Sequence, residues 1–180
     1  MDTLDDPELV AQAKSDSEAF SALYRRYVQR IYNYHYRHTG NVADAEDLTS
    51  QTFYRALRGI DTYHEKGATF QAWLFRIAHN LVVNWYRDHG CRQIISLDEM
   101  EDSLPLERAS PQVNLEMLEE QQRVLAILRE LPEDRKTLLL LKFVEKMSNA
   151  DIAVVLNKTE GAIKALYNRT LASLRQMLVE

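Results

Sequence analysis

The sequence predicts an all-α protein made of two small helical domains joined by a flexible linker. Across most of the 180 residues, apolar side chains recur every three or four positions, which is the period of an amphipathic helix. The periodicity fails between residues 91 and 114, where Pro105 and Pro111 break helices and five acidic residues face two basic ones. We therefore expect a first domain over residues 1–90, an acidic linker over 91–114 and a second domain over 115–180.

The composition narrows the classes of function. A single cysteine, Cys91, excludes an internal disulfide and a cysteine-rich zinc site, and it fits a reducing compartment such as the cytoplasm. The acidic amino terminus is unlike a signal peptide, and no apolar run approaches the ~20 residues that span a bilayer. The histidines lack metal-ligand spacing, and no phosphate-binding glycine loop or nucleophile motif is present. We expect no enzyme activity, no cofactor and no metal.

The first domain begins with two helices. Asp6 and Pro7 open a short helix that runs to Lys14, with proline at a permissive first-turn position. The second helix runs from Ser17 to Thr39, and Gly40 is expected to end it as a C-cap. Its expected core stripe comprises Phe20, Leu23, Tyr24, Tyr27, Val28, Ile31 and Tyr34.

Two further helices complete the first domain, one over residues 44–57 and one over residues 70–87. The earlier one has an apolar face of Ala45, Leu48, Thr52, Phe53, Ala56 and Leu57, and a polar face of Glu46, Asp47, Gln51, Arg55 and Arg58. The later one has an inner face of Phe70, Trp73, Leu74, Ile77, Leu81 and Trp85. Its outer face carries Arg76, His79, Asn80, Asn84 and Arg87, interrupted by Val83.

The second domain has the layout of a helix-turn-helix. A helix carrying Leu118, Leu125 and Leu128 leads to a turn at Pro132, and the next helix contains residues 138–143. Ser148 should cap a helix over 149–156, and Thr159 should cap the last helix, which runs to about Leu178. That helix has an expected core stripe of Ile163, Tyr167, Thr170, Leu174 and Met177. In such a unit the start of the second helix enters the major groove.

The distribution of charge bears on nucleic-acid binding more than the net charge of −5 does. Residues 66–92 carry four basic residues against one acidic residue, and residues 148–177 carry four against two. Such modest local excesses predict few phosphate contacts and weak binding of DNA by the free protein. A protein that needs a partner in order to bind DNA would have this distribution.

The sequence resembles the sigma factors of bacterial RNA polymerase, and the extracytoplasmic-function group in particular. Asp44-Ala-Glu-Asp-Leu with Gln51 and Phe53, followed by Phe70-Gln-Ala-Trp-Leu-Phe-Arg-Ile-Ala-His-Asn80, resembles region 2 of that family. Asp151-Ile-Ala, Glu160-Gly-Ala-Ile-Lys164 and Arg169 resemble region 4. The chain departs from the family at Leu166, where arginine is common, and at Lys146, where glycine is common.

The resemblance implies partners and site residues. The implied partners are core RNA polymerase, through its beta-prime clamp and beta flap, promoter DNA, and an anti-sigma factor, with no small-molecule substrate. The implied polymerase-binding residues are Asp44, Glu46, Asp47, Gln51 and Arg55. The implied −10 residues are Tyr63, His64, Lys66 and Phe70, in a loop that captures a flipped base, together with Arg76, His79, Asn80, Asn84 and Arg87. The implied −35 residues are Thr159, Glu160, Lys164, Ala165, Asn168 and Arg169.

Several alternatives stay open from the sequence alone. The chain could be a helix-turn-helix regulator that binds duplex DNA by itself, although that function leaves the run from Asp44 to Phe53 without a purpose. It could also be a helical interaction module, which would not need an exposed Lys164 and Arg169. The acidic linker is either an inert spacer or a mimic of nucleic acid inside a basic channel of the partner.

Overall fold

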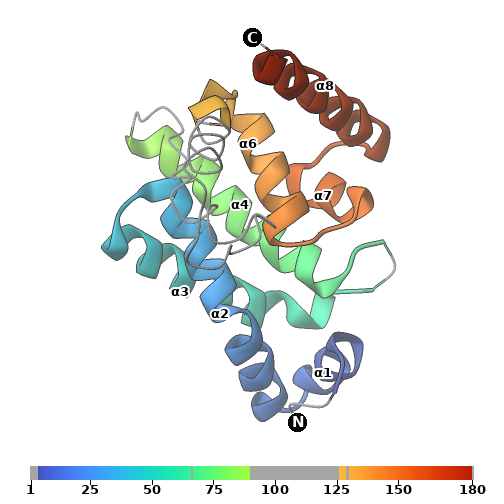
Figure 1. Ribbon diagram of the computed structural model, residues 1–180. Helices are drawn as coiled ribbons and strands as arrows, with labels where there is room; N and C mark the ends of the chain where they lie inside the picture. Colours follow the sequence, from blue (N-terminus) through green and yellow to red (C-terminus); the bar gives the residue numbers. More distant parts are fainter. Residues whose placement is uncertain (1–3, 66, 90–125, 129, 180) are drawn as a thin grey trace, which may run out of the picture.

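The computed structural model describes residues 4–65, 67–89, 126–128 and 130–179, and this part of the chain is helical with no strand (Figure 1). Neither the expected linker over 91–114 nor Leu118 and Leu125 fall within the described residues. The elements are α1 (Asp6–Ala13), α2 (Ser17–Thr39), α3 (Val42–Gly59), a 3-10 turn η1 (Ile60–Thr62), α4 (Phe70–His89), α6 (Glu133–Leu139), a π-helical turn η2 (Leu140–Val144), α7 (Asn149–Leu156) and α8 (Glu160–Val179). No helix in these ranges is long and apolar enough to cross a membrane.

Local capping fixes the helix boundaries of the first domain. Asp5 and Glu8 form a capping box at the start of α1. The side chain of Asp16 accepts a hydrogen bond from the backbone at the start of α2, and Asn41 does the same for α3. Gly40 ends α2 in the left-handed conformation, at φ 62°, as the sequence predicts.

The two helices of the helix-turn-helix also begin and end where the sequence predicts. The Ser148 hydroxyl accepts a hydrogen bond from the Asp151 backbone N–H at the start of α7. Asn157 ends α7 in the left-handed conformation, and Thr159 Oγ1 accepts from the Ala162 backbone N–H at the start of α8, at 3.1 Å. These three short polar side chains therefore fix where the two helices begin and where the first one ends.

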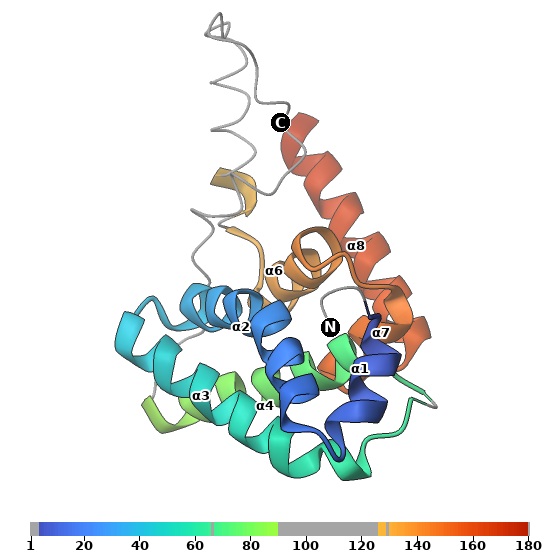
Figure 2. The same ribbon diagram turned by 90° about the horizontal axis from the view of Figure 1, so that it is seen from below.

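Helix α4 lies in the middle of the molecule (Figures 1 and 2). Helices α2 and α3 pack against it, while α1 packs on α2 at one end of the first domain. Helix α7 lies along α4 as well, so the second domain rests directly on the first. Helix α8 extends away from this contact, and its far end points out of the molecule (Figure 2).

The expected core is largely observed, with two corrections. Tyr24 was expected in the core but is 43% exposed, because only the edge of its ring packs against Phe53, at 4.7 Å between centroids. Leu57 was also expected in the core but is 51% exposed, and the neighbouring Ala56 takes the fully buried position.

Helix α4 buries more than the single inner face that its sequence pattern predicts. The further buried side chains are Ala72, Phe75, Ala78, Val82 and Tyr86. They are buried because α2, α3 and α7 all pack against this one helix.

A π-helical turn follows α6 where the sequence predicts one ordinary helix over residues 138–143. All four leucines from Leu138 to Leu141 are buried. Four successive residues of an α-helix point in directions 100° apart, so they cannot all face one neighbour. Here the leucines face core on more than one side, and η2 carries the last two through a wider turn.

Three histidines take part in the core of the first domain as neutral hydrogen-bonding groups. The Thr52 hydroxyl donates to Leu48 O, so His35 Nε2 must donate to Thr52 Oγ1, at 2.9 Å. The Tyr86 hydroxyl donates to His38 O, so His38 Nδ1 must donate to the Tyr86 oxygen, at 3.0 Å. His79 Nδ1 is hydrogen-bonded to the Tyr34 hydroxyl at 2.8 Å. Burial lowers the pKa of all three rings, that of His35 to about 3 and that of His79 to about 4.

We expect acid to destabilise the protein through these histidines. Between the ordinary pKa of 6.5 and the lowered folded values, the unfolded chain binds protons that the folded chain does not. The free energy of unfolding should therefore fall with falling pH by ~1.4 kcal/mol per pH unit for each histidine, and not at all from this source above about pH 7. Urea unfolding between pH 4 and 8.5 measures this slope. His79→Gln should lower the slope of the free energy of unfolding below pH 6.5 by the contribution of one histidine, and it should leave the slope between pH 7.5 and 8.5 unchanged. A variant with the same slope below pH 6.5 as the unsubstituted protein would contradict the assignment.

The left-handed backbone at Lys146 predicts a stabilising substitution. Lys146 has φ 54° and an exposed side chain, and a left-handed conformation costs a residue with a Cβ atom ~1–2 kcal/mol. Lys146→Gly should raise the free energy of unfolding by ~0.5–1 kcal/mol, because the flexibility of glycine in the unfolded chain offsets part of the gain. The matched control is Asn157→Gly, at φ 52°, where asparagine already tolerates this conformation and the gain should be smaller. Equal gains at the two positions would contradict this account.

Candidate functional site

The outer face of α3 carries the predicted polymerase-binding residues. Glu46, Asp47 and Arg55 are exposed, while Gln51 and Asp44 are partly buried. Gln51 Nε2 donates to Asp47 Oδ2 at 2.7 Å, one helical turn away, so these two side chains present a single polar surface. The structure therefore brings this set together on one face, with Asp44 at the first turn of the helix.

A strip of exposed side chains runs along α4 on the side away from the core. It consists of Arg76, Asn80, Val83 and Arg87, all exposed and spaced four, three and four residues apart, and we call it the α4 strip. Of the five residues predicted on this side, His79 is not part of the strip, because it is partly buried and bonded to Tyr34. Asn84 is partly buried beside the strip, facing α3.

Asn84 lines a groove that joins the two predicted surfaces of the first domain. The groove has a volume of ≈ 290 Å³ and runs between α3 and the end of α4. Asp47, Gln51 and Arg55 line it from α3, and Asn84 and Arg87 line it from α4. The predicted polymerase-binding face and the α4 strip are thus neighbours, which the sequence did not indicate.

The loop between η1 and α4 rests on a cluster of aromatic rings. Tyr63 and Phe70, both predicted to capture a base, are buried, and their ring centroids lie 5.9 Å apart. Trp73 and Tyr27 pack on the same pair, at 5.1 Å from Tyr63 and 5.6 Å from Phe70. Burial raises the pKa of Tyr63 to about 12, and its hydroxyl donates to Ala68 O at 2.9 Å. The Tyr63 and Phe70 rings therefore support the loop from beneath. Lys66, which was also predicted to contact the base, lies outside the described residues.

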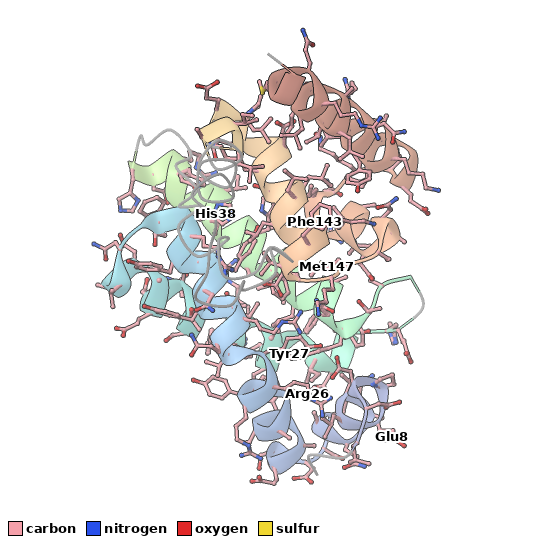
Figure 3. The ribbon with its side chains drawn as sticks, in the orientation of Figure 1. Glu8, Arg26, Tyr27, His38, Phe143 and Met147 are labelled. Atoms are coloured by element: carbon pink, nitrogen blue, oxygen red, sulfur yellow. The ribbon has the colours of Figure 1, made fainter. Side chains whose placement is uncertain are left out.

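A pocket opens beside this loop, and the sequence analysis missed one of its residues. It has a volume of ≈ 450 Å³ and lies between α1 and residues 63–65. Lys14, at the end of α1, lines it together with the exposed His64, and Lys14 Nζ donates to Tyr63 O at 3.2 Å. Asp6 of α1 binds Arg26 at 2.5 Å and accepts from the Tyr27 hydroxyl. Figure 3 shows Arg26 and Tyr27 on the part of α2 nearest to α1. In the sequence, Lys14 is marked only as an isolated lysine at the end of the first predicted helix.

The helix-turn-helix exposes all of its predicted DNA-reading residues. These are Thr159, Glu160, Lys164, Ala165, Asn168 and Arg169. Lys164 Nζ lies 2.8 Å from Glu160 Oε1, an exposed ion pair of a kind that contributes little to stability and is easily exchanged for another partner. Leu166, where the family often has arginine, is buried in the core together with Ile163 and Thr170. The departure at Leu166 therefore changes the core and not the exposed face.

No group of His, Cys, Asp and Glu side chains in the described ranges could hold a metal ion. The exposed groups of the three surfaces are amides, carboxylates, guanidinium groups and an ammonium group. They suit binding to protein and nucleic acid.

Comparison with known proteins agrees with this division of the chain. The family described as sigma-70 region 2 matches residues 23–91, and the family described as sigma-70 region 4 matches residues 121–174. Together the two matches cover more than half of the chain, in the order expected from the sequence.

Individual relatives point to the same group. The ECF RNA polymerase sigma factor BldN of Streptomyces coelicolor is 38% identical over 95% of this chain, and SigE of Mycolicibacterium smegmatis is 30% identical over 90%. The chain spans 65% and 62% of the lengths of these two relatives. The solved structure of CnrH in complex with the cytosolic domain of CnrY has the same fold, with a TM-score of 0.63 at 24% identity over 96% of each chain. The chain belongs to the sigma-70 family, in the group of the extracytoplasmic-function sigma factors.

Proposed function

We propose that this chain binds core RNA polymerase in the cytoplasm, directs it to particular promoters and helps to melt them. The observation that carries the proposal is that one chain presents two separate exposed faces suited to DNA. One is the α4 strip with its two arginines and one asparagine, and the other is the first half of α8. A chain with two such faces can read two promoter elements, and both faces belong to matched regions of the sigma-70 family.

The outer face of α3 is the proposed docking surface for the polymerase clamp. Asp47 and Gln51 form its hydrogen-bonded centre, with Glu46 and Arg55 beside them. A stand-alone regulator of duplex DNA would have no use for this polar face next to the α4 strip. Its position supports the sigma-factor function over that alternative.

The pocket between α1 and the η1–α4 loop is the proposed place for an extruded base of the −10 element. Extruding a base costs a few kcal/mol, and the pocket must return that free energy through contacts. Tyr63 and Phe70 are buried beneath the loop, so in our proposal they shape the pocket while Lys14 and His64 line it. The α4 strip then contacts the adjoining −10 DNA.

Helix α8 is the proposed −35 reader. Glu160, Lys164 and Asn168 follow one another at intervals of four residues from its amino-terminal end, which is the end that enters the major groove. Lysine can reach guanine, and asparagine can pair with adenine. An anti-sigma factor is a further proposed partner.

Run-off transcription with core polymerase over genomic fragments tests the whole proposal. We expect the protein to direct transcripts from a small set of promoters that core polymerase alone does not use. A protein that binds the same duplex fragments tightly without polymerase, and directs no transcript, would instead be a stand-alone regulator.

We expect Asp47→Ala combined with Gln51→Ala to weaken binding to core polymerase. The loss should be ~1–2 kcal/mol, a factor of about 5–30, because the two side chains form the centre of one surface. Both positions are helical and alanine is a good helix former, so the helix should stay folded. Fluorescence titration with core polymerase measures the affinity. Ser50→Ala, on the edge of the same helix face, is the matched control, and equal affinity of the double variant and this control would count against the docking surface.

Lys164→Ala and Arg169→Ala should affect promoter use in different ways. Lys164 lies nearer the start of α8, so we expect it to reach base edges and its loss to change the preferred −35 sequence by ~1–3 kcal/mol at one base pair. Arg169 lies ~140° further around the helix and should contact phosphate. Its loss should weaken all promoters about equally and reduce the salt dependence by about one phosphate.

Transcription from a promoter library at two salt concentrations separates these effects. Arg175→Ala, exposed further along α8, is the matched control and should change neither preference nor salt dependence. The opposite pattern, with Arg169→Ala reshaping preference, would reverse the assigned roles.

A further inference from the structure

One residue of the α4 strip is apolar, and the proposed function does not yet use it. Val83 is 44% exposed, although Val82 beside it is fully buried and Leu81 is 3% exposed. Val83 is therefore not part of the core face of α4. In the free chain its hydrophobic side chain lies in water, where a binding partner can cover it.

Val83 lies between polar residues of the strip and points in the same direction as they do. At 100° per residue, Arg76, Asn80, Val83 and Arg87 fall within about 60° of one another around the helix. Asn80 is about one turn before Val83, and Arg87 is about one turn after it. A DNA surface that contacts both Asn80 and Arg87 must therefore also meet Val83.

A single exposed valine needs no explanation on an ordinary protein surface. Val42, in the first turn of α3, is an example, because it is 53% exposed and lies on a helix without predicted DNA contacts. Val83 differs from Val42 because predicted DNA contacts lie one turn away on both sides of it. Its apolar side chain is thus placed where a base edge has to be met.

The chemistry of the base edges limits what Val83 can contact. Valine has no hydrogen-bond donor or acceptor in its side chain, so against a polar base edge it would displace water and leave a polar group unpaired. In the major groove, adenine, guanine and cytosine present such polar groups, whereas thymine also presents its C5 methyl group. The thymine methyl is therefore the group on a base edge that an exposed valine fits.

The spacing along α4 sets where that thymine lies relative to the base that Asn80 contacts. Val83 follows Asn80 by three residues, which is about 4.5 Å along a helix axis, and successive base pairs are about 3.4 Å apart. Asparagine can pair with adenine. For a helix that lies along the DNA groove, the two side chains therefore meet neighbouring base pairs.

We propose that Val83 selects a thymine of the −10 element by packing on its C5 methyl group, at the base pair next to the one that Asn80 contacts. This inference rests on the proposed function of the α4 strip. Arg76 and Arg87 provide charges that can contact phosphate, whereas the contact of Val83 involves no charge. Its effect on binding should therefore be the same at low and high salt, unlike that of a phosphate contact.

Replacement of thymine by deoxyuridine tests this contact, because deoxyuridine lacks only the C5 methyl group. Each thymine of the −10 element is replaced in turn in a promoter fragment that run-off transcription has identified. Fluorescence anisotropy then measures binding of the full chain in complex with core polymerase to each fragment. At one position, the loss of the methyl group should weaken binding about fourfold, the effect of one buried methyl-sized group, at two salt concentrations.

Val83→Ala should make thymine and deoxyuridine equivalent at that position, because the side chain that covers the methyl group is gone. The position is exposed and alanine is a good helix former, so α4 should stay folded. Val42→Ala is the matched control, since it shortens an equally exposed valine on α3, and it should retain the fourfold difference.

The outcomes separate this contact from the proposed function. A Val83→Ala chain that keeps the methyl effect overturns the inference. So does an unsubstituted chain that binds every deoxyuridine fragment as tightly as the thymine fragment, or a Val42→Ala chain that loses the effect as fully as Val83→Ala. A chain that directs no transcript contradicts the proposed function itself, and the inference then fails with it.

Discussion

The packing of α4 against three other helices is the constraint on which the rest of the structure depends. Helices α2 and α3 cover it from within the first domain, and α7 covers it from the second. Residues from Ala72 to Tyr86 on these sides are buried, and the α4 strip lies in solvent on the remaining side. A helix enclosed in this way presents its few exposed side chains in fixed positions. Fixed positions matter for the proposed reading of DNA, because the small excess of basic residues allows few phosphate contacts.

Two kinds of polar group stabilise this core in different ways. Within the first domain, His35 and His38 are neutral and bonded to Thr52 and Tyr86, so their burial carries no charge. Between the domains, Glu145 is buried as part of an ion pair, although burial raises its pKa. The hydrogen bonds of these neutral histidines stabilise the core of the first domain. In the ion pair only Glu145 is removed from water, because the Arg30 side chain remains 37% exposed.

The sequence predicts well what is decided locally and less well what is decided by packing between helices. The end of α2 and the starts of α7 and α8 agree with those expected, because Gly40, Ser148 and Thr159 set them within a few residues of chain. The burial of Phe75 and Tyr86, the inward position of His79 and the π-helical turn depend on where α2 and α7 lie.

The same distinction applies to the candidate site. The exposed face of α8 follows from helical periodicity alone, so all six of its predicted residues are on the surface. Lys14 joins the pocket because α1 packs on α2 through buried Leu9 and Val10, with Asp6 bonded to Arg26 and Tyr27. Tyr63 and Phe70 resembled surface rings in a loop, yet Trp73 and Tyr27 enclose them.

The unusual backbone at Lys146 connects the local chain to the contact between the two domains. Glu145 and Met147 are both buried in the contact between domains, while Lys146 between them is exposed. A continuing α-helix would separate the directions of residues 145 and 147 by about 200°, so it could not bury both on one side. The wide turn of η2 followed by a left-handed residue solves this problem, at a cost of ~1–2 kcal/mol for a side chain other than glycine.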